Sequence, residues 1–213
     1  MRVGVLALGS HDERHGAALP PDTDARIAER IAREAARRTG ASFLGVLCSS
    51  YELPGIDTGE HQSLGELVGE LRGVLRESKE DGVQAVVLVN AHGGNQKLRE
   101  KLDELEQELS MKVRFNTTVT EIEGPHAGTG ELSIGAVIEI TDESRLGEHS
   151  NFERYPEVGF VGLKEARRRY SWAEEHAHEV LERGVRVDKS LGDKLLERAI
   201  ADAVKDVEEL GRS

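Results

Sequence analysis

The sequence is poor in cysteine, in aromatic residues and in long apolar runs. It has 213 residues but one cysteine, Cys48, and aromatic side chains make up 4%. One cysteine cannot form an internal disulfide, which favours a reducing compartment, and the apolar residues before Cys48 predict a small core side chain rather than a reactive thiol. No stretch approaches the roughly 20 apolar residues of a membrane-spanning helix, and no signal peptide follows Met1. We therefore expect a cytoplasmic protein that does not enter a membrane.

Basic residues are also scarce relative to acidic ones. The chain has 28 Lys and Arg against 40 Asp and Glu, a net charge of -12. A general nucleic-acid binder needs a basic face, so this class is excluded, whereas a small anionic ligand is still allowed because one pocket can be positive on an acidic protein. The apolar runs VGVLAL, FLGVL and AVVLVN predict a folded chain, and its length predicts a single domain over residues 1–213.

Strand and helix signals alternate along the chain. Short apolar runs predict strands over residues 3–8, 42–47, 84–90 and 112–118. Helical spacing predicts helices over 24–38, from Ser63 to about 80, and over 96–109, 130–140 and 191–210, with an irregular segment between the last two. Ser63 and Glu66 are spaced as a capping box. This order predicts an α/β fold with a mostly parallel sheet covered on both faces, in which ligands bind at the carboxyl ends of the strands.

The loop after the first strand carries more ionisable side chains than a turn needs. Glu13 and His15 are two residues apart, which in an extended loop places both side chains on one side. Asp24 follows at the start of the next helix, where a helix cap is the simplest role. Together with His92 these residues form a nitrogen and oxygen donor set that suits Zn, Fe or Mn.

Two further glycine-rich segments contain histidine. The first, NAHGGN at residues 90–95, is either a simple turn or a backbone cradle for a phosphate, and it lacks the Lys and Ser/Thr of a P-loop. The second, PHAGTGELS at 125–133, brings His126 and Glu131 to the start of an apolar segment. Among the other ionisable residues, a pocket-lining role is open for His61 and His149, a surface or rim position is expected for His176 and His178, and a solvated helix face for Arg167 to Arg169.

Three segments, GSHDERHGAALPPDTD, NAHGGN and HAGTGELS, resemble in order the signature segments of the creatininase family of metal-dependent amidohydrolases. The resemblance spans residues 9 to 133. It implies a three-layer α/β/α sandwich, two divalent metal ions and hydrolysis of an amide bond outside ordinary peptides. It also implies roles for the residues noted above: Glu13 and His92 at one ion, His15 and Glu131 at the other, Asp24 bridging both, and His126 as the proton shuttle.

One departure from the family pattern bears on the substrate. Creatinine hydrolases have Tyr-Glu after the motif histidine, and that Glu is a metal ligand, whereas this chain has Gly93 and Gly94 there. Creatinine is therefore not the expected substrate, and the missing ligand must come from elsewhere in the chain, with Glu131 as the candidate.

The amino-acid sequence of the first segment resembles the archaeal formamide hydrolases of the family more than the creatinine hydrolases. That resemblance implies release of formate from a phosphorylated formylaminopyrimidine nucleotide in riboflavin and deazaflavin (F420) synthesis, with Fe²⁺ as the expected metal and Zn²⁺ or Mn²⁺ as alternatives. Family members commonly assemble, so a homo-oligomer is expected. Three alternatives stay open: another amide substrate, a metal-binding scaffold without catalysis, and a phosphate-binding protein. The candidate substrate contacts are Ser10, Gly93, Gly94 and Asn95.

Overall fold

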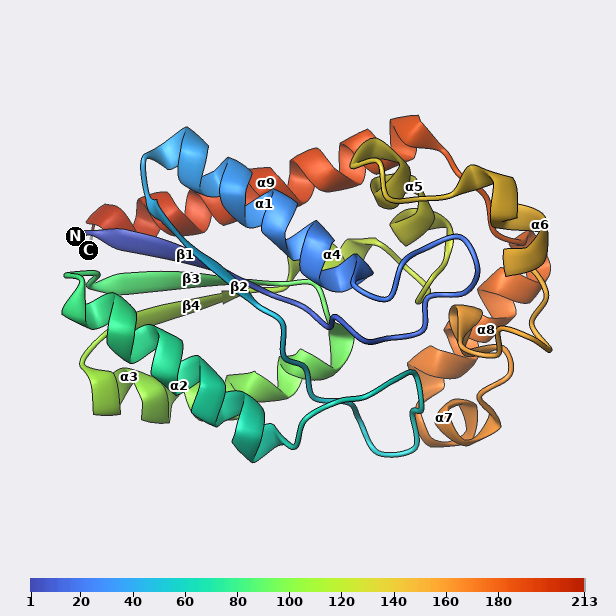
Figure 1. The fold of residues 1–213 in the computed structure, drawn as a ribbon, viewed down its shortest axis with the longest axis horizontal. Helices are drawn as coiled ribbons and strands as arrows, with labels where there is room; N and C mark the ends of the chain where they lie inside the picture. The colour runs from blue at the N-terminus through green and yellow to red at the C-terminus, as the bar shows by residue number, and fades with distance from the viewer. Residues whose placement is uncertain (213) are drawn as a thin grey trace.

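The computed structural model describes residues 1–212 and forms three layers around one parallel sheet. Its strands are β1 (Val3–Leu8), β2 (Ser42–Leu47), β3 (Ala85–Asn90) and β4 (Lys112–Asn116), in the order β2-β1-β3-β4. Helices α1 (Thr23–Thr39) and α9 (Lys189–Arg212) cover one face, and α2 (Leu64–Glu80) and α3 (Leu102–Leu109) cover the other (Figure 1). The predicted α/β/α sandwich is thereby confirmed.

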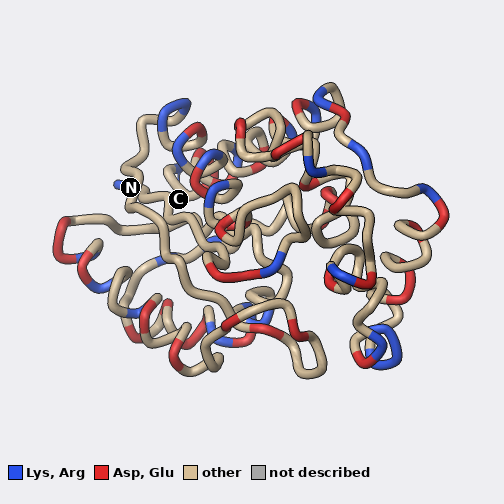
Figure 2. Tube along the Cα trace, turned by 45° about the vertical axis from the view of Figure 1, so that its right-hand side comes forward, with Lys and Arg blue, Asp and Glu red and all other residues tan. Residues whose placement is uncertain are grey.

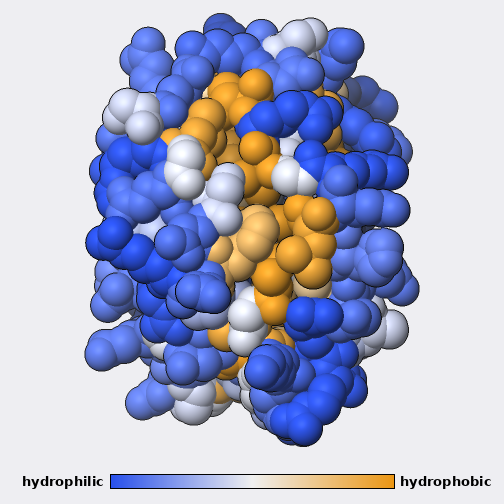
Figure 3. Space-filling model, turned by 90° about the vertical axis from the view of Figure 1, so that its right-hand side faces the viewer, coloured by the Kyte–Doolittle hydropathy of each residue, from blue (hydrophilic) through white to orange (hydrophobic). Residues whose placement is uncertain are grey.

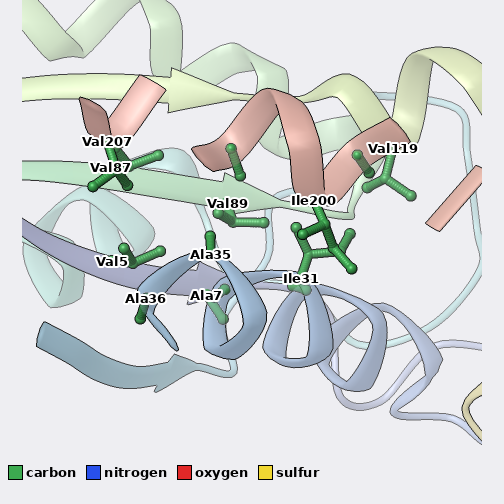
Figure 4. Close-up of a cluster of buried hydrophobic side chains, with 14 of the residues drawn as sticks. Val5, Ala7, Ile31, Ala35, Ala36, Val87, Val89, Val119, Ile200 and Val207 are labelled. Carbon is green, nitrogen blue, oxygen red and sulfur yellow. The ribbon is translucent and has the colours of Figure 1, made fainter. Parts of the chain in front are cut away.

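The apolar strands are buried on both faces because successive side chains point to opposite layers. In β1, Val5 and Ala7 pack toward α1 and α9, where Ile31 and Ile200 meet them (Figure 4). Leu6, the residue between them, packs toward α2 and α3. Full burial of one such aliphatic side chain contributes about 1.5–3 kcal/mol, so the two helical layers hold the sheet from both sides.

Several element boundaries follow the predictions closely. Ser63 and Glu66 form the predicted capping box at the start of α2, with each side chain bound to the other residue's backbone N–H. The helix expected over 96–109 begins earlier, as a 3₁₀ helix η1 (Gly93–Lys101) that continues into α3. The strand expected over 112–118 ends at Asn116, because the chain turns there into α4 (Thr118–Ile122). The buried segment at 130–140 is α5 (Thr129–Val137).

Two expectations were wrong. The segment between α5 and α9 is not irregular, because it contains η2 (Glu143–Arg145), α6 (Leu146–His149), η3 (Val158–Phe160), α7 (Lys164–Arg169) and α8 (Ser171–Arg183). The apolar face of α8 consists of Ala173, Ala177 and Val180, which is too weakly apolar to stand out in the sequence. Cys48 is exposed rather than in the core, because it follows the edge strand β2, whose residues are only half-buried.

Charged residues of both signs are interspersed along the outer helices (Figure 2). None of the helices over residues 1–212 is both long and apolar enough to cross a membrane.

The connections at the carboxyl end of the sheet determine where a ligand can bind. After β1 the chain turns to α1 on one face, and after β3 it turns to η1 and α3 on the other. Diverging connections of this kind open a crevice between the two strands, which is where ligands bind in such sheets.

Candidate metal centre

The crevice between β1 and β3 collects the ionisable side chains that the sequence singles out. Glu13 and His15 come from the loop after β1, Asp24 from the first turn of α1, and His92 from the residue before η1. The fifth, Glu131, lies in the first turn of α5. A Cβ atom at Gly9 would overlap the backbone of Asp24 and Ala25. Only glycine therefore lets the loop pass close enough to α1 to bring these side chains together.

The five side chains form two donor triads that share one carboxylate. Donor atoms within 4.8 Å of one another define the triads, Glu13–Asp24–His92 and His15–Asp24–Glu131. The two oxygens of Asp24 divide between them, since Oδ1 lies 3.0 Å from Nε2 of His15 and Oδ2 lies 3.1 Å from Nδ1 of His92. A carboxylate in this position can bridge two cations.

The remaining carboxylates, Glu13 and Glu131, each complete one triad. Oε2 of Glu13 lies 3.0 Å from Nδ1 of His92, and Oε2 of Glu131 lies 3.6 Å from Nε2 of His15. Glu131 also accepts a hydrogen bond from the backbone N–H of Ala127 at 3.1 Å, which fixes one of its oxygens. All five residues of the two triads are at most 4% exposed, so solvent does not screen their charges.

Backbone carbonyls determine which ring nitrogen of each histidine faces the carboxylates. Nδ1 of His15 donates to the carbonyl oxygen of Glu13 at 3.1 Å, and Nε2 of His92 donates to that of Tyr51 at 3.0 Å. A carbonyl oxygen can only accept, so these nitrogens carry the protons in the neutral rings. The opposite nitrogens, Nε2 of His15 and Nδ1 of His92, therefore direct lone pairs at the carboxylates. Metal-ligating histidines are held in this way.

The electrostatics of the site call for positive charge. Burial disfavours the imidazolium form of His15, but the carboxylates, above all Asp24, outweigh burial and raise its pKa to about 10. Burial is likewise outweighed at His92, where Glu13 and Asp24 raise the pKa well above its ordinary value. Burial favours the protonated form of Glu13, yet the imidazoles, above all His92, hold its pKa well below the ordinary value.

These observations fit bound metal ions. Three buried carboxylates facing two lone-pair nitrogens repel one another unless a cation lies between them, and in the metal-free protein protons on the histidines fill that role. Oε2 of Glu13 is buried and lacks a hydrogen bond with acceptable geometry, although it lies close to His92. An orphaned carboxylate oxygen in a nitrogen and oxygen donor set suits Zn, Mn or Fe.

His126 lies beside both triads, and one of its ring nitrogens is within 4.8 Å of donor atoms of Glu13 and His15. Its Nδ1 is 3.8 Å from Oε1 of Glu13 and 3.9 Å from Oε1 of Glu131. Its Nε2 donates to the carbonyl oxygen of Arg14 at 2.9 Å. Nδ1 of the neutral ring is therefore free to accept a proton from a group located between the two carboxylates.

A cavity of about 440 Å³ opens in front of the triads. One wall is aromatic: the ring of Phe160 lies 5.4 Å from the rings of His126 and Trp172, and Trp172 lies 5.7 Å from His176. Figure 3 shows apolar side chains gathered in a strip across the end of the molecule toward which the strands point. The described residues that line the cavity include Glu52, Glu121 and Glu123 but no Lys or Arg.

Two of the four expected substrate-contact residues line the cavity and two do not. Gly93 and Gly94 line the cavity, but Ser10 and Asn95 do not. Ser10 is fully buried, and the side chain of Asn95 accepts from the N–H of Tyr51 and donates to the carbonyl of Ser49. These two residues therefore support the loops and do not fit the expected substrate contact.

The histidines outside the motifs differ in their distance from the site. His149 is buried behind the site, where it bonds to Ala18 and Ala127, and it does not line the cavity. His61 stacks on His92 with ring centroids 5.2 Å apart. His176 lines the cavity, whereas His178 is exposed.

The cavity residues that the sequence did not single out include Glu52, Glu123, Phe160 and Trp172. Glu123 lies two residues before the segment PHAGTGELS and could have been noticed for that reason. Burial raises its pKa well above the ordinary value, and the nearby Glu131 adds to this effect. The other three belong to loops and helices whose positions only the fold reveals.

The sequence is similar to those of known proteins over nearly its whole length. The family model for creatininase (creatinine amidohydrolase) matches residues 1–207. Among curated proteins, the 2-amino-5-formylamino-6-ribosylaminopyrimidin-4(3H)-one 5'-monophosphate deformylase of Methanothermobacter thermautotrophicus is 48% identical over 98% of this chain and 89% of its own length. The protein of that name from Methanothermus fervidus is 43% identical over 99% of this chain and 85% of its own length.

Solved structures show the same fold at lower identity. Creatinine amidohydrolase (creatininase) superposes with a TM-score of 0.71 at 18% identity, covering 97% of this chain and 89% of that one. A mutant creatininase described as the Zn-Zn type has a TM-score of 0.70 at 17% identity, and one described as creatininase Mn has 0.69 at 18%; each pairs 97% of this chain with 90% of its own. From the family model over 207 residues and the relatives above 40% identity, the chain belongs to the creatininase family.

Proposed function

We propose that this protein is a metal-dependent amidohydrolase that removes formate from 2-amino-5-formylamino-6-ribosylaminopyrimidin-4(3H)-one 5'-monophosphate, leaving a diaminopyrimidine, in riboflavin and F420 synthesis. One observation carries the proposal: a relative at 48% identity over nearly the whole chain bears the name of this deformylase. The two triads and His126 give the chain the side chains that such a reaction requires.

We further propose two divalent ions per chain. Glu13 and His92 would hold one ion, His15 and Glu131 the other, and Asp24 would contact both. The division of the Asp24 oxygens between the two histidines supports this assignment. Fe²⁺ is the proposed metal, and Zn²⁺ and Mn²⁺ suit the same donors.

The ions, when bound, would polarise the formyl carbonyl and lower the pKa of the attacking water. The protein's own residues position the reactants and move the proton. Nδ1 of His126 faces the gap between Glu13 and Glu131, where it can accept a proton from the attacking water. The same nitrogen then returns the proton to the amine, which cannot leave as an anion. The carbonyl of Arg14 keeps the ring oriented during both transfers.

The aromatic wall suits a planar heterocycle. Trp172 and Phe160 meet edge to face at an interplanar angle of 79°, and both residues line the cavity. Stacking of an aromatic base on such a side chain contributes about 1–3 kcal/mol. We propose that this wall holds the pyrimidine while the formamide group extends toward the triads.

The test is to separate metal binding from turnover. His126→Gln keeps an amide that can donate to the carbonyl of Arg14 but removes the proton acceptor. We expect this variant to bind metal like the wild type and to release formate at least about 100-fold more slowly. The control is His178→Gln, which changes an exposed histidine and should leave both properties unchanged. Wild-type turnover in His126→Gln would refute the assigned role.

Three further expectations from the sequence stay predictions. They are a single catalytic domain over the whole chain, a cytoplasmic location and assembly into a homo-oligomer. Size-exclusion chromatography with light scattering would measure the last of these directly.

A further inference from the structure

The loop between β2 and α2 crosses directly over Gly94. A Cβ atom at this position would overlap the carbonyl oxygen of Tyr51. That carbonyl accepts from Nε2 of His92 at 3.0 Å, and the N–H of Tyr51 donates to the side chain of Asn95 at 2.9 Å. The loop backbone therefore occupies the space that a side chain after the motif histidine would need.

The crossing brings Glu52 close to Glu13, one member of the first triad. One donor atom each of Glu13, Glu52 and His61 lies within 4.8 Å of the others. Glu13 thus belongs to this group as well as to the triad with Asp24 and His92. Its Oε2 is buried and lies 3.0 Å from Nδ1 of His92 without a hydrogen bond of acceptable geometry, so this carboxylate, which belongs to both groups, has unused capacity for a ligand.

Two hydrogen bonds hold the Glu52 carboxylate in place and leave lone pairs available for a metal ion. Its Oε1 accepts from the N–H of Leu53 at 2.6 Å, and its Oε2 accepts from Oγ1 of Thr58 at 3.0 Å. A carboxylate has about four lone-pair sites, so two remain. Among the described residues no Lys or Arg pairs with it, and the nearest basic group is Nε2 of His61 at 3.9 Å. Its side chain is 11% exposed, which makes a carboxylate without a cation unfavourable.

His61 fits a positioning role. Its Nδ1 lies 2.8 Å from Oγ of Ser50 and its Nε2 lies 3.2 Å from Oγ1 of Thr58, so both nitrogens already have partners. Its ring stacks on His92. His61 and Thr58 together fix the distance between Glu52 and the first triad.

We propose that Glu52 is an additional ligand of the ion held by Glu13 and His92. His61 and Thr58 are positioning residues for it. This inference rests on the proposed metal centre, and it assigns Glu52 to one of the two ions rather than to both.

The experiment measures Mn²⁺ binding to the metal-free full-length chain by calorimetric titration and by electron paramagnetic resonance. We expect the wild type to bind two ions. Glu52→Gln should bind one of them at least about 10-fold more weakly, as losses in a metal's ligand environment do, and the other with unchanged affinity. Thr58→Val leaves the carboxylate in place and should weaken the same ion by a smaller factor.

Glu121→Gln is the matched control. Glu121 also lines the cavity but belongs to α4, and its side chain is 58% exposed, so both ions should bind as in the wild type. Circular dichroism establishes that each variant is folded. Wild-type affinity for both ions in Glu52→Gln would overturn the inference and leave the metal centre intact. A wild type that binds no Mn²⁺, Zn²⁺ or Fe²⁺ would instead refute the proposed function and this inference together.

Discussion

Replacing Gly94 by alanine tests the close approach of two loops on which the site depends. The new Cβ would overlap the carbonyl group of Tyr51 and lie 2.9 Å from Nε2 of His92. Neither neighbour is the free end of a flexible side chain, so the loop must move. Movement would weaken the hydrogen bonds from His92 to Tyr51 and from Tyr51 to Asn95.

The expected loss of stability can be worked out in two ways, from the steric overlap or from the hydrogen bonds lost when the loop moves. Forcing an extra carbon into a packed site costs about 1–3 kcal/mol. Giving up two buried hydrogen bonds, at about 0.5–1.5 kcal/mol each, costs a similar amount. We therefore expect Gly94→Ala to lower the free energy of unfolding by about 1–3 kcal/mol. Because the loop that moves carries Glu52, the variant should also bind one Mn²⁺ ion more weakly.

The neighbouring residue provides the control. A Cβ at Gly93 would meet no atom within 4 Å, and a glycine-to-alanine change at a tolerant position is neutral or stabilises by up to about 1 kcal/mol. Urea denaturation of the metal-free proteins, followed by circular dichroism, compares the two variants. Equal stability of Gly94→Ala and Gly93→Ala would refute the close approach of the loops.

Three other predictions address the centre and the cavity. Asp24→Asn should lose both metal ions, measured by mass spectrometry of bound metal, because one carboxylate serves both triads; retention of two ions would contradict the bridge. Trp172→Ala should raise KM more than it lowers kcat in the formate-release assay, since the ring contacts substrate away from the reacting bond; an unchanged KM would count against the aromatic wall. In metal-free protein, the pKa of His15 is raised from 6.5 to about 10, so the stabilisation from its imidazolium is complete below pH 6.5 and is lost as the pH rises through 10. The difference in unfolding free energy between the wild type and His15→Gln should shrink over that range, and a difference that grows would show that the sign is wrong.

The sequence predicted best where local signals and burial agree. The strands at 3–8 and 42–47 have the predicted bounds because each is a short apolar run with turn residues after it. The clustering of Glu13, Asp24 and His92 follows from the rule that ligand sites lie at the carboxyl ends of parallel strands. The glycine-rich pattern also singled out His126 and Glu131, and the resemblance to a family supplied their expected roles as proton shuttle and metal ligand.

The missed features depend on contacts between distant segments. Glu52 is 39 residues from Glu13 in the sequence, and nothing in its own segment signals that Gly94 lets the loop approach. Phe160 and Trp172 meet the cavity through helices that the weak apolar pattern of their segment concealed. The apolar neighbours of Cys48 predict a core position, but Cys48 is exposed because β2 is an edge strand. The position of a strand within the sheet cannot be read from the sequence of that strand alone.

The most direct test of the central claim is formate release from the formylaminopyrimidine ribonucleotide by the wild-type protein, loaded with Fe²⁺ under anaerobic conditions. The account predicts release that stops when a chelator removes the metal and resumes when Fe²⁺ is restored. Release that continues unchanged in the chelated, metal-free protein would contradict the metal-dependent mechanism. Absence of release from protein that holds two ions would contradict the proposed substrate.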